Sequence, residues 1–423
     1  MLDIKKIRDN AREIEKKLRS KDPTIDLKEI LSIDEQVRSL KTEAELLRSH
    51  LKKTSKKIGE KKRLGQDDST ITSKVIEIKE SLSKLNLELK TSEEKLEKRL
   101  LYLPNIPDHD VKISLDPKEN VCIKTFSKAP SFSFSPKNHL ELNEKLGIFD
   151  FVRGAKLTGT GWPIYRDMGA RLEWALLNYM IDIHLKNGFT FCLVPHLVKE
   201  EAMYASAQLP KFQGQFYKLD DPDYPFTLIP TGEVSLNGMH LDEIFSKDEL
   251  PKKYITYTPC FRRESGAAGA GERGLIRVHQ FNKVEMFAFT EPEKSDEMFE
   301  SMIQSAEEVL KGLNLHFRNM LLVTGDMAFA ASRTVDIEVF LPGQDRYYEV
   351  SSVSNCRDFQ ARRSKIRYRL GQKKPELVHT LNGSGVATAR LMVALLENNQ
   401  NEDGSITLPE VLRPYLGGLD RLN

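Results

Sequence analysis

The sequence has few cysteines and no long apolar run. Its four cysteines are far apart and form no CxxC pair, and its nine histidines are scattered, so we expect neither a disulfide framework nor zinc. No stretch of about 18 apolar residues and no cleavable leader pattern is present, so we expect no membrane span and no secretory signal. Scattered thiols are typical of a reducing compartment, and we expect a cytoplasmic protein.

Glycine and proline are rare in the first 100 residues, where apolar residues recur in steps of three and four. The recurrence runs from Ile30 to Ile58 and again from Ile71 to Leu96, with an average period typical of a supercoiled helix. Between the two runs, Gly65 would stop one helix and Asp68 or Ser69 would cap the next. The pattern predicts an antiparallel α-helical coiled-coil hairpin over about 28–100, preceded by one short amphipathic helix over 4–18.

The net charge of +2 is unevenly distributed. Residues 1–100 carry 26 Lys and Arg against 20 Asp and Glu, whereas the remaining residues carry 38 against 42. The excess is concentrated at 48–63, where eight basic residues face the single acid Glu60. Such a cluster indicates contact with a phosphate backbone, although a solvated coiled-coil face is an equal alternative. The residues we expect to contact phosphates are Lys52, Lys53, Lys56 and Lys57.

Three prolines at 104, 107 and 117 mark a linker over about 104–120, after which the composition becomes mixed. Segments at 254–259, 333–342 and 345–354 have strand character and fit a mostly antiparallel sheet. We therefore expect a helical domain at 1–103 and a second domain at 104–423.

The most informative segment is CFRRESGAAGAGERGLIRVHQFNKVE at 260–285. It places arginines and glutamates on two strand-like arms, 261–264 and 275–285, joined by a loop of small residues. The planar, permanent charge of arginine suits phosphate oxygens, and strands would hold it rigidly, so the segment predicts a polyanion such as a nucleotide as its ligand. For an arbitrary hairpin of this composition, solvated arginines are the alternative interpretation.

The order Phe, Arg, x, Glu, loop, Arg, x, His, x, Phe resembles motif 2 of the class II aminoacyl-tRNA synthetases. Residues 380–398, TLNGSGVATARLMVALLEN, resemble motif 3, and residues 185–195, LKNGFTFCLVP, resemble motif 1. With IPTGE at 229–233 and YYEVSSVSNCRDFQARR at 347–363, the whole chain is similar to bacterial-type seryl-tRNA synthetases. The resemblance implies an α+β fold, with a catalytic domain on an antiparallel sheet of six to eight strands and an N-terminal tRNA-binding coiled-coil arm.

The resemblance implies ATP-dependent activation of L-serine to seryl-adenylate and transfer of the seryl group to tRNA(Ser), by a homodimer formed through motif 1. Whether a selenocysteine tRNA is also charged stays open. The implied catalytic residues are Arg262 at the α-phosphate and Arg390 against adenine. Glu264 and Phe281 would bind adenine, and Arg277 would face the γ-phosphate. The other implied ATP-binding positions are Arg263, Val278, Glu349, Val350, Ser351 and Ser352.

The resemblance implies that magnesium binds together with ATP. The positions that match the family's magnesium ligands are Glu349 and Ser352. Because side chains alternate along a strand, a twist or bulge is needed for these two to meet at one ion. The implied serine pocket must pair the ammonium with a carboxylate and satisfy the hydroxyl. Its matching positions are Thr231, Gly232, Glu233, Glu285 and Ser384. Asn382, just before Gly383, would either help to order the loop there or serve an ordinary turn.

Two positions depart from the family pattern, because Gly232 stands where alanine is usual and Arg263 where serine is usual. Neither change removes a ligand. One alternative function is a non-catalytic scaffold with an inactive synthetase fold, but such decay should delete site residues first, and these remain. Another alternative is an enzyme that loads an amino acid onto a carrier protein. Loss of the helical arm would indicate such an enzyme, and here the arm is intact.

Overall fold

In this computed structural model, the described residues are 1–65, 67, 69–264 and 273–423. The expected helix cap Asp68 and most of the small-residue loop of motif 2, 265–272, lie outside the described residues. The chain divides into two compact units, Met1–Pro104 and Asn105–Asn423, which are described separately. Among the described residues, no helix combines the length and the apolar character needed to cross a membrane.

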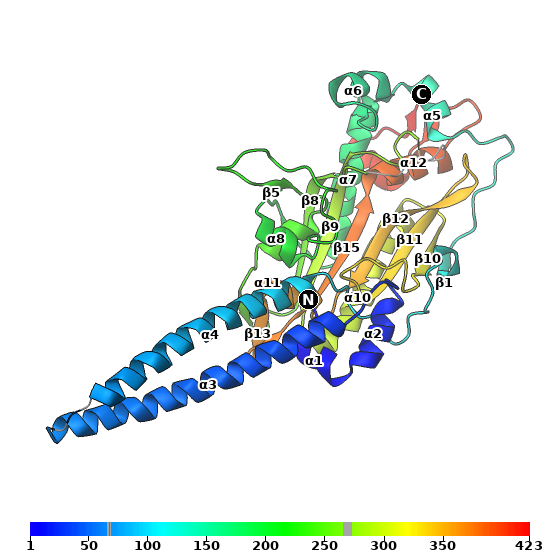
Figure 1. Cartoon of the computed structure of the whole chain (residues 1–423). Helices are drawn as coiled ribbons and strands as arrows, with labels where there is room; N and C mark the ends of the chain where they lie inside the picture. The colour runs from blue at the N-terminus through cyan, green and yellow to red at the C-terminus, as the bar shows by residue number, and fades with distance from the viewer. Residues whose placement is uncertain (66, 68, 265–272) are drawn as a thin grey trace. The chain divides into compact units, whose positions relative to one another are not determined.

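The first unit is built on two long antiparallel helices, α3 (Lys28–Arg63) and α4 (Ser69–Leu101), drawn in blue in Figure 1. Leu40 and Ala44 of α3 pack against Leu85 of α4 along the apolar seam. An ion pair of 2.6 Å between Lys41 Nζ and Glu93 Oε1 crosses from one helix to the other. The predicted helical hairpin is therefore confirmed, with its core formed by the residues that recur in steps of three and four.

The beginning of α4 and the residues before α3 differ from the expectation. Ser69 is the first residue of α4 and not its cap; the carboxylate of Asp67 accepts a hydrogen bond from the Ser69 backbone N–H at 3.0 Å. The single helix expected over 4–18 is two helices, α1 (Ile4–Asp9) and α2 (Ala11–Arg19). Asn10 separates them because its φ of −137° and ψ of 44° are not helical.

The second unit contains an eight-stranded sheet in which every neighbouring pair is antiparallel except β4 and β8. This confirms the α+β class and the antiparallel sheet. In spatial order the strands are β1 (Val121–Phe126), β10 (Phe317–Leu321), β11 (Arg333–Leu341), β12 (Arg346–Asn355), β15 (His379–Ala387), β9 (Gln280–Thr290), β8 (Lys252–Phe261) and β4 (Thr190–Cys192).

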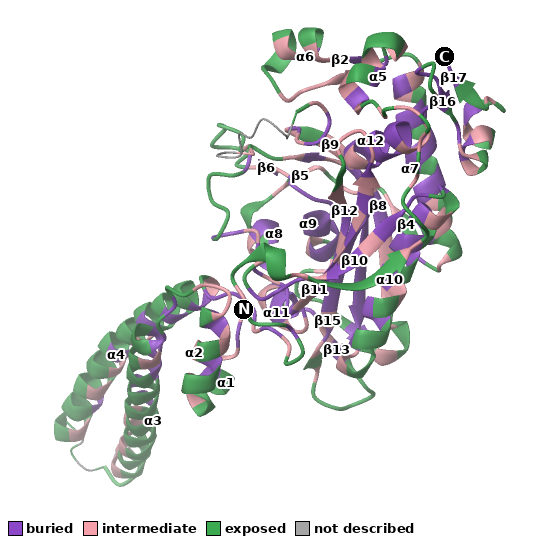
Figure 2. Ribbon diagram, turned by 90° about the vertical axis from the view of Figure 1, so that its right-hand side faces the viewer, coloured by how far each residue is buried: buried purple, intermediate pink, exposed green. Residues whose placement is uncertain are grey.

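The two faces of the sheet are covered by different helices, and strand β9 shows how. Its residues Met286 and Ala288 belong to the main core, which also includes residues of α7 (Met168–Lys186), α10 (Ser295–Gly312) and α12 (Thr388–Asn398). Phe287 and Phe289 pack into a second cluster with residues of α9 (Glu233–Gly238) and α11 (Phe359–Ser364). Figure 2 shows the buried residues, in purple, gathered on the sheet and these helices. Because side chains alternate along a strand, the odd-numbered residues of β9 share the second face.

The two strands that flank the motif 2 loop end farther from that loop than predicted. Strand β8 ends at Phe261 and β9 begins at Gln280, because the ladder between them ends at that pair. Arg262 and Glu264 therefore lie beyond the strand, and Glu264 has a positive φ of 45°. The Arg262 backbone N–H still donates to the His279 carbonyl at 2.9 Å, which fixes the first residue after the ladder.

Candidate active site

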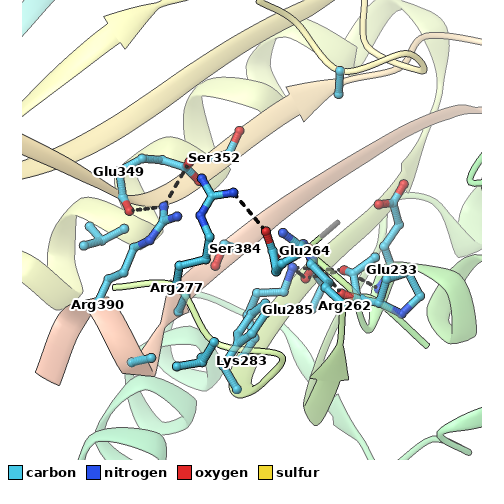
Figure 3. A pocket seen from close by; sticks show the side chains of 18 of the residues that line it. Glu233, Arg262, Glu264, Arg277, Lys283, Glu285, Glu349, Ser352, Ser384 and Arg390 are labelled. Carbon is cyan, nitrogen blue, oxygen red and sulfur yellow. Dashed lines mark hydrogen bonds and ion pairs between the residues drawn. The ribbon is translucent and has the colours of Figure 1, made fainter. Parts of the chain in front are cut away.

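A cleft of about 610 Å³ in the second unit brings together most of the predicted site residues (Figure 3). Strands β9, β12 and β15, the loop before α9 and the segments flanking the motif 2 loop contribute to it. The predicted residues that line it are Thr231, Glu233, Arg262, Glu264, Arg277, Val278, Phe281, Glu285, Glu349, Val350, Ser352, Ser384 and Arg390.

One side of the cleft carries two arginines of motif 2, Arg262 and Arg277. The Arg262 guanidinium lies over the Phe281 ring at 5.2 Å and donates from Nε to the Pro230 carbonyl at 3.2 Å. These contacts hold its side chain without consuming its terminal nitrogens, which stay suited to an anion. Arg277 donates from Nη1 to Glu264 Oε2 at 3.1 Å. Motif 2 thus supplies guanidinium groups and a carboxylate at the same wall.

The arginine of motif 3 reaches the cleft from α12. Arg390 Nη1 donates to the backbone oxygen of Glu349 at 2.8 Å and approaches its carboxylate at 3.2 Å. Its Nε donates to the Ile276 carbonyl at 3.3 Å. The side chain of Arg390 is therefore hydrogen-bonded both to the segment that follows the motif 2 loop and to strand β12.

Strand β12 contains the irregularity that alternation requires. Its ladder with β11 pairs Ile337 with Ser351 but Glu338 with Glu349, so Val350 is an extra residue. This bulge changes the alternation, and Glu349 and Ser352 both line the cleft as a result. Ser351 does not line the cleft, and its hydroxyl donates to the Ser384 carbonyl at 2.5 Å.

Asp336, which the sequence did not single out, stands across the ladder from Ser352. Burial and the charge of Glu349 raise the pKa of Asp336. Its Oδ1 is buried and has no hydrogen-bond partner among the described residues. Carboxylate and hydroxyl oxygens at Glu349, Ser352 and Asp336 are the hard donors that magnesium prefers, so these residues fit a magnesium ion that arrives with phosphates. No group of three or more His, Cys, Asp or Glu suited to a metal occurs within the described ranges.

The other side of the cleft is small and polar. Thr231 donates its hydroxyl to Glu285 Oε2 at 2.8 Å. Lys283, also missed by sequence, donates from Nζ to Thr231 Oγ1 at 3.0 Å and forms an ion pair with Glu285. The side chains of Lys283 and Glu285 are 9% and 3% exposed, so this pair is almost fully withdrawn from water. The alternation of side chains along a strand could have predicted Lys283, because Lys283 stands between Phe281 and Glu285 on the same face of β9.

Glu233 is the second buried carboxylate of this side. Burial, followed by the charge of Glu285, raises its pKa to about 7. Its Oε1 accepts hydrogen bonds from Gln360 Nε2 at 2.5 Å and from Asn382 Nδ2 at 3.2 Å. Asn382 therefore orders the carboxylate of the pocket from within strand β15, which is neither the loop role nor the turn role that the sequence left open.

Ser384 lies on β15 beside these carboxylates, directly across from Glu285 in the β15–β9 ladder. Its Oγ is buried, and among the described residues it has no hydrogen-bond partner. A buried hydroxyl in that state is unusual in folded proteins and indicates a polar ligand atom. The small side of the cleft therefore offers two carboxylates, an ammonium group and an unsatisfied hydroxyl.

Three predicted positions are not among the residues that line the cleft. Arg263 is exposed, and its Nη1 donates to the Gly214 carbonyl at 3.1 Å. Gly232 lies between two lining residues, and Ser351 faces Ser384, as described above. In the first unit, the four lysines predicted to contact tRNA are exposed on α3, at 52, 53, 56 and 57.

Comparison with known protein families identifies the family to which this fold and cleft belong. Residues 217–399 match the core domain of class II tRNA synthetases (G, H, P, S and T), so the fold and cleft are those of a class II aminoacyl-tRNA synthetase. Residues 1–107 match the seryl-tRNA synthetase N-terminal domain. The serine–tRNA ligase of Chlamydia abortus is 53% identical over 98% of both chains. That of Chlamydia trachomatis serovar L2 is 48% identical over 100% of this chain and 99% of its own. The chain belongs to the seryl-tRNA synthetase family.

Solved structures agree with this membership. The crystal structure of seryl-tRNA synthetase from Pyrococcus horikoshii complexed with ATP has a TM-score of 0.95 and 36% identity, covering 100% of this chain and 99% of that one. The cytoplasmic serine–tRNA ligase of Naegleria fowleri in complex with AMP has a TM-score of 0.89 and 30% identity at the same coverage.

Proposed function

We propose that the protein is a serine–tRNA ligase that activates L-serine with ATP and transfers the seryl group to tRNA(Ser). The observation that carries the proposal is that one cleft joins an arginine-rich wall to a small polar pocket with an unsatisfied hydroxyl. Relatives at 53% and 48% identity over nearly the whole chain are named serine–tRNA ligases, which supports the same reaction.

In the first step, a carboxylate oxygen of serine attacks the α-phosphorus of ATP, the bond to the bridging oxygen breaks, and pyrophosphate leaves. Arg262 stands at the wall where charge would develop on the α-phosphate, so we assign it the stabilisation of that transition state. In the second step, a hydroxyl of the terminal ribose of tRNA attacks the carbonyl carbon of seryl-adenylate, and AMP leaves. Arg390, Phe281 and Glu264 would hold the adenine during both steps.

The small polar side of the cleft is the serine pocket in this proposal. The ammonium group of serine would pair with the carboxylates of Glu233 and Glu285, and the seryl hydroxyl would satisfy Ser384, whose Oγ has no partner among the described residues. Alanine would leave that buried hydroxyl unpaired, which is the strongest means of discrimination available to a pocket of this kind. Lys283 would hold the Glu285 carboxylate and the Thr231 hydroxyl in place through its contacts with both.

Magnesium would be held by Glu349 and Ser352, with Asp336 across the ladder from Ser352. When bound, the ion neutralises charge on the phosphates and orients the leaving group. Arg390 contacts the Glu349 carboxylate at 3.2 Å, so this arginine also sets the direction of the ligand oxygen.

We assign tRNA binding to the helical arm, 1–103, and catalysis to 104–423. Lys52, Lys53, Lys56 and Lys57 are exposed along α3 and would neutralise phosphates of the tRNA backbone. Because such contacts release counterions, tRNA affinity should fall steeply as the salt concentration rises. Charging of tRNA takes place where ATP and tRNA are found, so we assign the enzyme to the cytoplasm.

We also propose a homodimer through the motif 1 segment, 185–195. Strand β4 is an edge strand of the sheet, and Leu185, Phe191 and Leu193 around it are 43%, 37% and 77% exposed. Apolar side chains gathered at a sheet edge are typical of an interface. Sedimentation equilibrium should give twice the chain mass for the wild type, and Leu193→Asp should shift the protein toward the monomer. A monomeric wild type would contradict this assignment.

The test of the proposed function is serine-dependent exchange of labelled pyrophosphate into ATP, with and without tRNA. Glu285→Ala should abolish the exchange, because the pocket loses a charge partner of the ammonium, and should lower the melting temperature by several degrees while the protein stays folded at the assay temperature, because Lys283 loses its buried partner. Glu293→Ala, which removes an exposed glutamate outside the cleft, is the control and should keep full exchange. Exchange near the wild-type rate in Glu285→Ala would show that the pocket is assigned wrongly.

A further inference from the structure

Thr256 is a buried residue behind the serine pocket that none of the motifs includes. It lies on β8 directly across from Glu285 in the β8–β9 ladder, and its side chain is fully buried. Its hydroxyl lies 3.3 Å from the Tyr257 carbonyl, so the hydroxyl is occupied within its own strand. Its γ-methyl group faces the loop between Thr231 and Glu233, as the distances to Gly232 show.

Gly232, in the middle of that loop, is not required by the backbone. Its φ of −61° and ψ of −21° lie in the right-handed helical region that every residue adopts. The requirement is one of space, because a Cβ atom at this position would lie 2.7 Å from Thr256 Cγ2 and 3.1 Å from Glu285 Cβ. Carbon atoms in contact are normally about 3.5–4.0 Å apart. The methyl group of Thr256 therefore occupies the space that any side chain at 232 would need.

We propose that Thr256 is a positioning residue of the serine pocket, and that its γ-methyl group and the bare Cα of Gly232 together set how closely the loop approaches Glu285. The proposal rests on the proposed function, since it assigns a role within the serine pocket. The distance that depends on this packing is the 2.8 Å hydrogen bond from Thr231 Oγ1 to Glu285 Oε2. A side chain at 232 would push the loop away from β9 and lengthen that bond.

Displacement of this loop should weaken the binding of serine and leave the binding of ATP unchanged. The loop carries Thr231 and Glu233, which line the small polar side of the cleft. The residues assigned to adenine and magnesium lie on other segments: Phe281 on β9, Glu349 on β12 and Arg390 on α12. A purely structural role for Thr256 would instead change stability alone, without separating the KM for serine from the KM for ATP.

The test combines single and double variants of full-length protein in the pyrophosphate exchange assay, together with thermal melting. Gly232→Ala should raise the KM for serine about tenfold, a typical consequence of overpacking a buried site, and change the KM for ATP less than twofold. Thr256→Ser removes only the γ-methyl group, so the double variant Gly232→Ala/Thr256→Ser should return the KM for serine to within about threefold of wild type. Thr256→Val keeps the methyl group, so Gly232→Ala/Thr256→Val should stay as impaired as Gly232→Ala.

The outcomes distinguish failure of this inference from failure of the proposed function. If the wild type shows no serine-dependent exchange, the proposed function fails. If the wild type is active but Gly232→Ala leaves the KM for serine unchanged, or if Thr256→Ser and Thr256→Val rescue it equally, the role of the methyl group is overturned. Should Gly232→Ala not fold, recovery of soluble, active protein in the double variant with Thr256→Ser supports the inference, and failure to recover it contradicts the inference.

Discussion

Lys283→Met is the substitution that most directly tests the charge balance of the serine pocket. Lys283 is the cation paired with Glu285 in a region where the two side chains are only 9% and 3% exposed. Glu233 is a second buried carboxylate, and the charge of Glu285 already contributes to raising its pKa to about 7. Without Lys283, two carboxylates would share a pocket that has lost its ammonium group, and one of them should take up a proton at neutral pH.

The expected magnitude follows from the interaction that the neutral carboxyl can no longer make. A hydrogen bond between charged groups contributes about 1.5–3 kcal/mol, so loss of one charged partner for the serine ammonium should raise the KM for serine about 10- to 100-fold at pH 7. Breaking a buried ion pair by removing one partner costs about 3–5 kcal/mol, and water entering the cleft should reduce the loss of unfolding free energy to about 2 kcal/mol. The melting temperature should therefore fall by several degrees.

The assay is pyrophosphate exchange as a function of serine concentration between pH 6.5 and pH 9. In Lys283→Met, the KM for serine should fall as the pH rises, because the second carboxylate regains its charge. Lys252→Met is the matched control: Lys252 pairs with Glu249 at 2.8 Å outside the cleft, and the two side chains are 20% and 47% exposed, so this ion pair contributes about 0–1 kcal/mol. A Lys283→Met protein with the wild-type KM for serine at pH 7, or with a pH-independent tenfold increase, would refute the reasoning.

Three further predictions concern Glu233, Arg262 and the helical arm. Because the folded pKa of Glu233 is raised from 4.5 to about 7, its contribution to the unfolding free energy should decline as the pH rises from about 4.5 to about 7, while the KM for serine falls as the carboxylate ionises. Glu233→Gln should flatten both profiles in melting and exchange assays; unchanged profiles would remove Glu233 from that role. Arg262→Ala should lower the adenylation rate about 10²- to 10³-fold in single-turnover experiments and change ATP affinity little, whereas a loss confined to ATP affinity would contradict the assignment. Replacing the arm lysines with Gln should leave exchange intact, weaken tRNA charging and reduce its salt dependence; an unchanged salt slope would mean that the cluster is a solvated face. The lysines replaced together are Lys52, Lys53, Lys56 and Lys57.

The helical arm is the part of the fold that composition and periodicity alone predict. A repeat of three and four residues depends only on local geometry, and Leu40, Ala44 and Leu85 pack on the expected seam. The break at Asn10 was not predictable, because the apolar spacing continues through it and only the backbone angles change. The eight-stranded sheet followed from the motifs, since short strands give weak periodic signals.

The candidate site was predicted where a single motif carries the residues, and it was incomplete where distant strands meet. Lys283 was within reach of alternation along β9. Asp336 and Thr256 were not, because each enters the site through its partner across a ladder, Ser352 and Glu285. The reach of the motif 2 strands was overestimated, because hydrogen-bond pairing between β8 and β9, and not residue type, determines where they end. The reason for glycine at 232 likewise depends on a neighbour 24 positions away, at 256.

The identity of the amino acid that the protein attaches to tRNA tests the proposed function most directly. Full-length protein would be incubated with ATP, magnesium, unfractionated tRNA and an equimolar mixture of the twenty amino acids. The ester formed at the terminal ribose would then be identified by mass spectrometry. We predict that serine alone is found, because the pocket offers carboxylates for the ammonium and an unsatisfied hydroxyl at Ser384 for the side chain. Attachment of a different amino acid, or the absence of any ester while the folded protein binds ATP, would contradict the central claim.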